Sequence, residues 1–222
     1  YEQYPDIVPL IITGDYSAGA ISQYSRTDPE YPQALENYKK YVRTLAEKIG
    51  PGKKYYDIEN EWYLRKKANG EASDIEVFAD AIMASSDVIR EVNPDAVITV
   101  DISDKEGWTD KVVEELNKHG GVKKYIDVLN IHSYMAFHVA LWPEQYLEYG
   151  NQSDSAPASH KKGYVSSFKL WEDAGLGDIP VWATEYGHTT GYQYNNVDEK
   201  RKADYYVRQT CLLDRYGVDI KY

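Results

Sequence analysis

The chain has 222 residues, 42% of them hydrophobic, which is enough for one sizeable core and argues for a globular fold rather than disorder. Its 25 basic and 36 acidic residues give a net charge of −11, which argues against nucleic acid or an anionic membrane as partner and suits a neutral ligand. The single cysteine, Cys211, excludes an intrachain disulfide and a cysteine-based metal site. It falls in a helical pattern, so we expect it to be buried.

The first third of the chain predicts a strand, a helix and a second strand. Residues 7–12, IVPLII, are a short apolar and β-branched run typical of a buried strand, and Asp15 follows in a polar loop. Apolar residues at steps of three and four predict a helix over 35–49, which a Gly-Pro pair ends. The segment YYDIE then leads, as a strand, into Asn60 and Glu61.

The middle of the chain repeats this alternation. Ser73 and Glu76 form a capping-box pattern in front of a second helix. The run AVITV predicts the next strand, which ends at Asp101. A shorter helix over 112–116 follows, and YIDVLNI predicts a strand that ends at Ile131.

The last third begins with a long aromatic segment around Trp142, which we expect to be a loop. A weaker helix is predicted over 163–174. The run IPVWAT predicts a strand that leads into Glu185. An amphipathic helix over 203–213 and a strand over 218–222 complete the pattern.

Alternating strands and helices, with nearly continuous apolar strands, predict an α/β fold with a parallel sheet covered by helices. No glycine-rich phosphate-binding motif follows any strand, so a nucleotide-binding fold has little support. The pattern has six strands and five helices, whereas a closed (β/α)8 TIM barrel has eight of each and about 250 residues. We therefore expect residues 1–222 to be a partial TIM-barrel catalytic domain. The first two β/α units and the end of the last strand would be missing, and an open six-stranded sheet is the alternative.

The chain starts with YEQYP and stops inside an apparent strand, so we expect it to be a piece of a longer protein. No apolar run approaches the roughly 20 residues of a membrane helix, and a membrane partner is not expected. The sequence does not determine the cellular location, and a secreted or cell-surface protein is compatible with it.

Glu61 and Glu185 are the most informative residues of the chain. Each follows a buried strand, and the carboxyl ends of parallel barrel strands share the mouth where catalysis takes place. Two carboxylates that face one cleft are the minimum apparatus for cleaving a glycosidic bond. Taken alone, either glutamate could be a loop or surface charge. His132 and Tyr134 follow a third strand two positions apart, so both can face the same side, although a buried structural histidine is an equal alternative.

These motifs resemble clan A of the glycoside hydrolases, the (β/α)8 retaining glycosidases, over nearly the whole chain. That clan has Asn-Glu at the end of its fourth strand and a nucleophilic Glu at the end of its seventh, which match Asn60-Glu61 and Glu185. A His or Tyr near the end of its sixth strand matches His132 and Tyr134. This numbering makes the chain cover approximately strands 3 to 8. Within the clan, the β-xylosidase-like families are the nearest.

The resemblance implies a retaining glycoside hydrolase that cleaves O-glycosidic bonds by double displacement, without a cofactor. Glu61 would be the acid/base and Glu185 the nucleophile, and Asn60 would bind the sugar 2-hydroxyl. One departure is Trp62, where many clan members have Pro. The Trp common at the end of the eighth strand would lie past Tyr222.

An oligosaccharide or polysaccharide is the expected partner. Tyr134, His132 and Tyr186 are candidates to orient Glu185. Trp62, Trp142 and Trp182 could stack on sugar rings or belong to the core, and Asp15 and Asp101 could bind hydroxyls or cap loops.

Other classes of function remain as alternatives. His138 and His188 are dispersed and form no H-E-x-x-H pattern, so no catalytic metal is expected. A catalytically inactive, carbohydrate-binding TIM barrel is the main alternative. A lyase or aldolase barrel would usually require a strand-end lysine or metal ligands, and no strand-end lysine is present.

Overall fold

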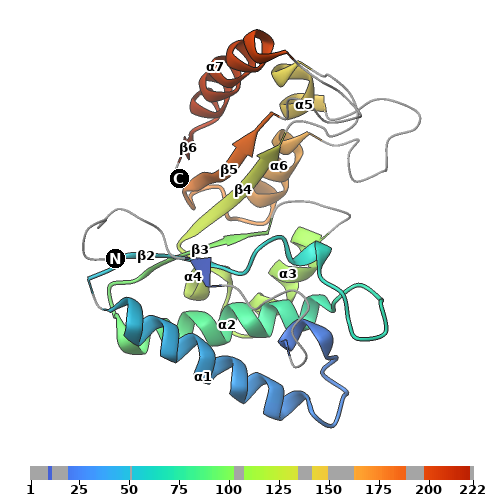
Figure 1. Cartoon of the computed structure of the whole chain (residues 1–222), viewed down its shortest axis with the longest axis vertical. Coiled ribbons are helices and arrows are strands. Elements are labelled where there is room, and N and C mark those ends of the chain that lie inside the picture. Colours follow the sequence, from blue (N-terminus) through green and yellow to red (C-terminus); the bar gives the residue numbers. More distant parts are fainter. Residues whose placement is uncertain are drawn as a thin grey trace. The chain divides into compact units, whose positions relative to one another are not determined.

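Parallel strands alternate with helices along the described part of the chain (Figure 1). The computed structural model describes residues 10–11, 20–50, 52–102, 108–134, 142–149, 163–188 and 198–220. The chain divides into two units, Tyr1–Asp101 with Asp110–Val128 and Ile102–Thr109 with Leu129–Tyr222. None of the helices among the described residues combines the length and apolar character needed to cross a membrane.

The described strands of the first unit are β1 (Leu10–Ile11), β2 (Tyr55–Ile58) and β3 (Val97–Asp101), and they lie in that order. They pair in parallel, with Leu10 opposite Asp57 and Tyr55 opposite Val97. The helices are α1 (Tyr31–Ile49), α2 (Ile75–Val92), α3 (Trp108–Asn117) and α4 (Val122–Tyr125), with 3₁₀ turns η1 (Ile21–Gln23) and η2 (Trp62–Leu64).

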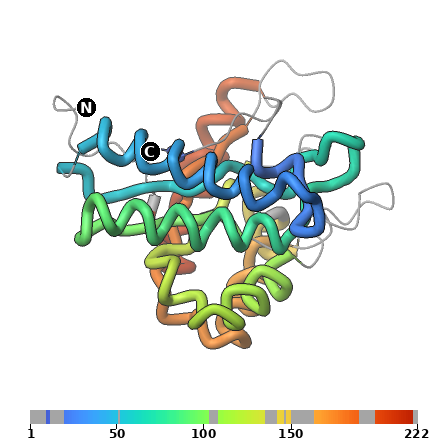
Figure 2. Tube along the Cα trace, turned by 90° about the horizontal axis from the view of Figure 1, so that it is seen from below, coloured from blue at the N-terminus to red at the C-terminus, as the bar shows by residue number. Residues whose placement is uncertain are grey.

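Helices α1 and α2 lie side by side, as Figures 1 and 2 both show. The apolar spacing of α1 buries Tyr38 and Val42 on one face, and α2 buries Ile82 and Ile89. A proline in the first turn of α1 occupies a position where no intrahelical N–H bond is lost. Gly50 ends α1 with a φ of 84°, a conformation that glycine adopts without strain.

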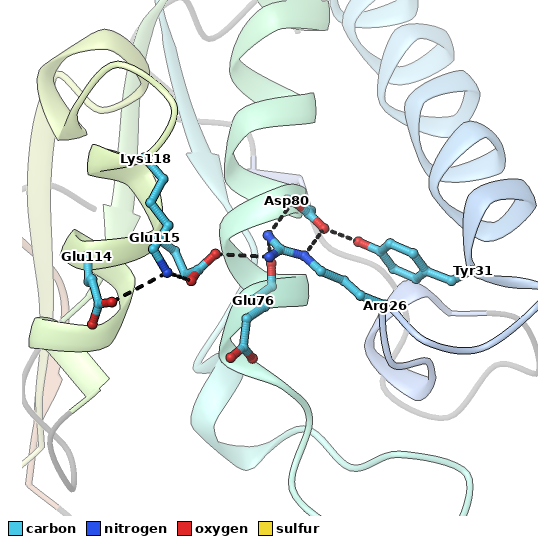
Figure 3. A network of polar contacts seen from close by, with 7 residues as sticks. All are labelled: Arg26, Tyr31, Glu76, Asp80, Glu114, Glu115 and Lys118. Atoms are coloured by element: carbon cyan, nitrogen blue, oxygen red, sulfur yellow. Dashed lines mark hydrogen bonds and ion pairs between the residues drawn. The ribbon is translucent and has the colours of Figure 1, made fainter.

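A polar network around Arg26 fastens the segment before α1 to α2 and α3 (Figure 3). The Arg26 guanidinium donates two 2.8 Å hydrogen bonds to the Asp80 carboxylate and one of 2.9 Å to Glu115. These bonds and charges raise the pKa of Arg26 above its ordinary value, the bond to Asp80 most. Arg26 also donates to the carbonyl oxygen of Glu76 at 3.0 Å, and the Tyr31 hydroxyl donates to Asp80. The ammonium group of Lys118 lies 2.5 Å from the Glu115 carboxylate and 3.4 Å from that of Glu114.

The described strands of the second unit are β4 (Val128–Tyr134), β5 (Val181–Gly187) and β6 (Val218–Ile220), again in chain order and parallel. The helices are α5 (Pro143–Tyr149), α6 (Tyr164–Asp173) and α7 (Glu199–Arg215). Asp198 caps α7 by accepting a 2.7 Å hydrogen bond from the Arg201 N–H. Gly163 permits close packing of α5 and α6, because a Cβ there would lie 2.4 Å from the Leu147 carbonyl oxygen.

The predicted parallel α/β alternation is confirmed, but four local predictions are wrong. The segment after Trp142 forms α5 rather than a loop. Strand β4 continues to Tyr134 instead of ending at Ile131. The capping box is not formed, because Asp74 is the N-cap of α2 and the Ser73 hydroxyl donates to the Ser22 carbonyl oxygen at 2.7 Å.

The fourth error concerns Cys211, which is exposed. It does lie in a helix, α7, as predicted. The buried positions of α7 are Tyr205, Gln209, Leu212 and Leu213, so the adjacent cysteine falls outside the core-facing stripe.

Candidate active site

The first candidate carboxylate lies in a strained turn directly after β2. The strand ends at Ile58, and Glu59 and Glu61 then adopt left-handed backbone conformations with φ of 57° and 43°. This conformation is disfavoured for residues with a Cβ, and it persists where surrounding contacts over-determine it. The Tyr63 hydroxyl donates a 2.5 Å hydrogen bond to Oε1 of Glu61. The turn therefore places Asn60 and Glu61 just beyond the strand end.

Sequence reasoning missed two residues of this turn, Glu59 and Tyr63. Glu59 is only 2% exposed and is contacted by Tyr38 and Arg65. A signal was present, because a carboxylate that continues an apolar strand must find partners if it is buried. Nothing in the sequence distinguishes Tyr63 among the 22 tyrosines.

The second candidate carboxylate, Glu185, is aimed by a β-bulge. Strands β4 and β5 are in register up to Ile131 opposite Ala183, and His132 then lies opposite Glu185. Thr184 is therefore an extra residue on β5. A bulge of this kind re-aims the side chains that follow it and is frequent beside active sites.

Two side chains of β4 contact Glu185. The Tyr134 hydroxyl donates a 2.9 Å hydrogen bond to Oε2, and Nδ1 of His132 lies 3.8 Å from Oε1. The His132 side chain is 2% exposed, whereas that of Glu185 is 35% exposed. The hydroxyl of Tyr164 on α6 also donates to the His132 carbonyl oxygen. The imidazole is thus fixed in the core, while the carboxylate stays accessible to solvent.

Gly187 and Tyr186 continue β5 with different surroundings. A Cβ at Gly187 would lie 3.0 Å from the Tyr206 hydroxyl and 3.4 Å from Cε1 of Tyr134, so the glycine lets Tyr134 lie close to the strand. The Tyr186 hydroxyl lies 3.3 Å from Oγ1 of Thr210 on α7, and its ring packs edge-on against Tyr206. These contacts direct Tyr186 toward the helix rather than toward Glu185.

His188 follows β5 and belongs to a buried polar group. It is 9% exposed and packs against the rings of Tyr205 and Tyr206 at 5.2 and 5.4 Å. Burial lowers the pKa of His188 to about 4, against the opposing effect of the neighbouring Gln209 side chain, so the imidazole is neutral at neutral pH. Gln209 also donates to the carbonyl oxygen and hydroxyl of Ser133 at 2.7 and 2.6 Å.

The three candidate tryptophans differ in exposure. Trp62 is 1% exposed and stacks on Phe78 at 5.0 Å, and Trp182 is 6% exposed, so of the two alternatives both side chains fit the core. Trp142 is 54% exposed. The Arg208 guanidinium lies 4.7 Å from the centre of the Trp142 ring and is itself held by Glu144 at 2.5 Å. An exposed aromatic face of this kind suits a sugar ring.

The remaining candidates are Asp15, His138 and Asp101. Asp15 and His138 lie outside the described residues. Asp101 ends β3 and is 7% exposed. Among the residues that the structure describes, no group of three or more His, Cys, Asp or Glu side chains could hold a metal ion. Glu61 belongs to the first unit and Glu185 to the second, so their convergence on one cleft stays a prediction.

Comparison with known families decides the classification. Residues 15–217 match the family model of the cellulases, glycosyl hydrolase family 5. The chain belongs to glycosyl hydrolase family 5. The resemblance to clan A is thereby confirmed, although the matching model is a cellulase model rather than one of the β-xylosidase-like families. A search of curated proteins found no match.

Solved structures of glycosidases resemble this family 5 chain. They include a family 39 glycoside hydrolase from Bacteroides cellulosilyticus (TM-score 0.59, 17% identity, 97% of this chain and 43% of that one). A glucosidase from Croceicoccus marinus has a TM-score of 0.58 and 11% identity over 84% of this chain and 37% of its own. An endo-1,4-β-D-mannanase from Thermotoga petrophila has a TM-score of 0.52 and 19% identity over 85% and 53%.

The likeness shows the fold, which is that of the TIM-barrel glycosidases. This chain spans 37% to 53% of the length of these three structures.

Proposed function

We propose that the chain carries the catalytic carboxylates of a retaining glycoside hydrolase that acts on a neutral oligosaccharide or polysaccharide. The observation that supports it most directly is the contact of Glu185 with Tyr134 and His132 at the end of β5, in a chain that belongs to family 5. A glucosidase and a mannanase are among the similar structures, and the net charge of −11 suits an uncharged sugar polymer.

Glu185 is proposed as the nucleophile. A nucleophilic carboxylate must be ionised, accessible and held in one orientation. The Tyr134 hydrogen bond and the nearby His132 restrict the side chain from two directions, and 35% exposure leaves it open to a substrate. The covalent glycosyl-enzyme would form on a Glu185 oxygen.

Glu61 is proposed as the acid/base. A glycosidic oxygen is a poor leaving group, so a protonated carboxyl must donate to it as the bond breaks and later activate a water molecule. Asn60 precedes Glu61 in the same turn and is proposed to bind the 2-hydroxyl. For retaining chemistry, the Glu61 and Glu185 carboxyl groups should lie about 5–5.5 Å apart, whereas an inverting pair lies roughly 6.5–9.5 Å apart.

Trp142 is proposed as a sugar-stacking platform. Its exposed ring is backed by Arg208, and its other ring neighbour, Tyr205, lies at 5.8 Å and also packs against His188. Through Tyr205, the Trp142 platform is connected to His188, which lies three positions beyond Glu185. Aromatic faces pack well against the apolar C–H faces of pyranose rings.

The test is a panel of aryl glycosides with leaving groups of different acidity, applied to the full-length protein and to its Glu61→Ala and Glu185→Ala variants. Glu185→Ala should remove nearly all activity on every substrate, because no covalent intermediate can form. Glu61→Ala should still form the intermediate from glycosides of acidic phenols and accumulate it as a pre-steady-state burst.

Azide needs no base and should restore turnover of Glu61→Ala. Equal losses on good and poor leaving groups, with no burst and no azide rescue, would refute the acid/base role. A wild-type protein that binds oligosaccharides but hydrolyses no glycoside would instead identify a catalytically inactive carbohydrate-binding barrel.

A further inference from the structure

The turn that carries Asn60 and Glu61 is unusual in its backbone. Among the described residues, Glu59 and Glu61 are the two non-glycine residues with positive φ, and only Asn60 separates them. Glutamate has no short side chain that could bond locally to compensate for a left-handed conformation, as asparagine and aspartate have. Two such residues in three positions therefore require external contacts that hold them in place.

Those contacts converge on the side chain of Glu59. It is 1% exposed and accepts a 3.1 Å hydrogen bond from the Tyr38 hydroxyl on α1. Its other oxygen lies 3.5 Å from Nη2 of Arg65, whose side chain is 2% exposed. The Glu59 N–H donates to the Ile11 carbonyl oxygen of β1 at 2.7 Å. The Tyr38 hydroxyl also lies 2.8 Å from the hydroxyl of Ser85 on α2.

The Glu59–Arg65 pair closes the short segment that contains both Asn60 and Glu61. Within it, the Leu64 N–H donates to the Glu61 carbonyl oxygen and the Arg65 N–H to that of Trp62, both at 2.8 Å. The segment is therefore tied at its two ends by a buried ion pair and internally by backbone bonds.

A buried ion pair contributes little to stability compared with apolar residues of similar size, because both charges must be desolvated. Where such a pair is kept, a role in fixing one conformation is a reasonable hypothesis. Here the conformation that it could fix is the strained turn of the candidate acid/base.

We propose that the buried Glu59–Arg65 ion pair is a positioning device that holds the left-handed turn and thereby aims the Glu61 carboxyl at the glycosidic oxygen. The inference rests on the proposed function of Glu61. Neither Glu59 nor Arg65 would touch the substrate. Loss of the pair should impair proton donation more than the nucleophilic step, because the contacts that hold Glu185 come from β4.

The dependence of rate on the leaving group is the readout that separates positioning from stability. In Glu59→Gln, the rate on glycosides of weakly acidic alcohols should fall at least about tenfold more than the rate on glycosides of acidic phenols, which need little proton donation. The matched control is Val42→Ala, which removes a fully buried side chain of α1. It should lower the melting temperature and leave unchanged the ratio of the rate on phenol glycosides to the rate on alcohol glycosides.

The double variant Glu59→Leu/Arg65→Met separates the two roles further. Replacing both partners by apolar side chains should restore most of the melting temperature that Glu59→Gln loses, whereas the leaving-group defect should remain. If the double variant recovers the wild-type ratio, or if Glu59→Gln has the same ratio as Val42→Ala, the pair is structural only and the proposal is wrong.

If Glu59→Gln does not fold, Tyr38→Phe keeps the ion pair, removes one hydrogen bond to Glu59, and should raise the ratio by a smaller factor. An unchanged ratio in folded Tyr38→Phe then counts against the proposal. A wild-type protein that hydrolyses no glycoside overturns the proposed function, and this inference with it. If the wild-type protein hydrolyses glycosides and azide rescues Glu61→Ala, the proposed function holds. The ratio measured for Glu59→Gln then decides the positioning role by itself.

Discussion

Replacing Tyr134 by phenylalanine removes one hydroxyl and tests the assignment of Glu185. The hydroxyl donates a 2.9 Å hydrogen bond to Oε2 of Glu185. A hydrogen bond to a charged group contributes about 1.5–3 kcal/mol. The Glu185 side chain is 35% exposed, so water compensates part of the loss, and about 1–2 kcal/mol is the expected effect.

If that loss falls on the transition state for attack by Glu185, kcat/KM should decrease by about 5–30-fold. The decrease should be similar for good and poor leaving groups, because every substrate requires the nucleophile. This pattern differs from the one expected for variants around Glu61. Steady-state kinetics on a series of aryl glycosides measures it directly.

Tyr186→Phe is the matched control, because it removes the same group from a tyrosine adjacent to Glu185 whose hydroxyl faces Thr210. It should retain kcat/KM within about twofold, as expected for loss of one weak hydrogen bond outside the site. Equal losses in the two variants, or a Tyr134→Phe protein with wild-type kinetics, would refute the reasoning.

Three further variants test the surroundings of the site. Gly187→Ala should lower activity less than Tyr134→Phe, since the added Cβ would lie 3.0 Å from the Tyr206 hydroxyl but only in ordinary contact, at 3.4 Å, with the Tyr134 ring; a loss as large as that of Tyr134→Phe would contradict this reading. The pKa of His188 is about 4 in the folded chain, below its ordinary value of 6.5. Between pH 6.5 and 4, the imidazole is therefore protonated in the unfolded chain but not in the folded one. The free energy of unfolding should therefore fall as the pH drops from 6.5 to 4, by at most about 3 kcal/mol. Urea titrations of His188→Phe should show a flatter pH dependence, and an identical slope would exclude this cause. Arg26→Met leaves the carboxylate of Asp80 without its bidentate partner and should lower the free energy of unfolding by about 1–3 kcal/mol in urea titrations, whereas no change would mean that the network is fully compensated by water.

The fold class could be predicted from the sequence because its signal is local. Short apolar runs rich in β-branched residues, such as Ala96–Val100, favour buried strands, and their alternation with amphipathic helices implies parallel pairing. Glu61 and Glu185 are candidates because each directly follows such a run, where a charged side chain must either be exposed or be bound by partners. Both arguments need only neighbours in sequence.

The remaining features depend on contacts between distant segments. The bulge at Thr184 arises from the pairing of β5 with β4 and has no sequence mark. The burial of Trp62 depends on stacking against Phe78 of α2, so the sequence could not decide between a core position and a sugar-stacking one. The need of Glu59 for a partner could be predicted, but the partner itself could not, because Arg65 lies beyond the turn and no periodic pattern connects the two residues.

Each candidate carboxylate follows an interruption of regular strand geometry, a left-handed turn at Glu61 and a bulge before Glu185. The contacts that hold each interruption come from the same unit as the carboxylate, Arg65 for the turn and Tyr134 for the bulged strand. Variants with no shared partners have additive effects on stability within roughly 0.3–0.5 kcal/mol. The losses in Glu59→Gln and Tyr134→Phe should therefore add in the double variant. A larger coupling in urea unfolding would mean that the two carboxylates share a network and that the site is assembled as one piece.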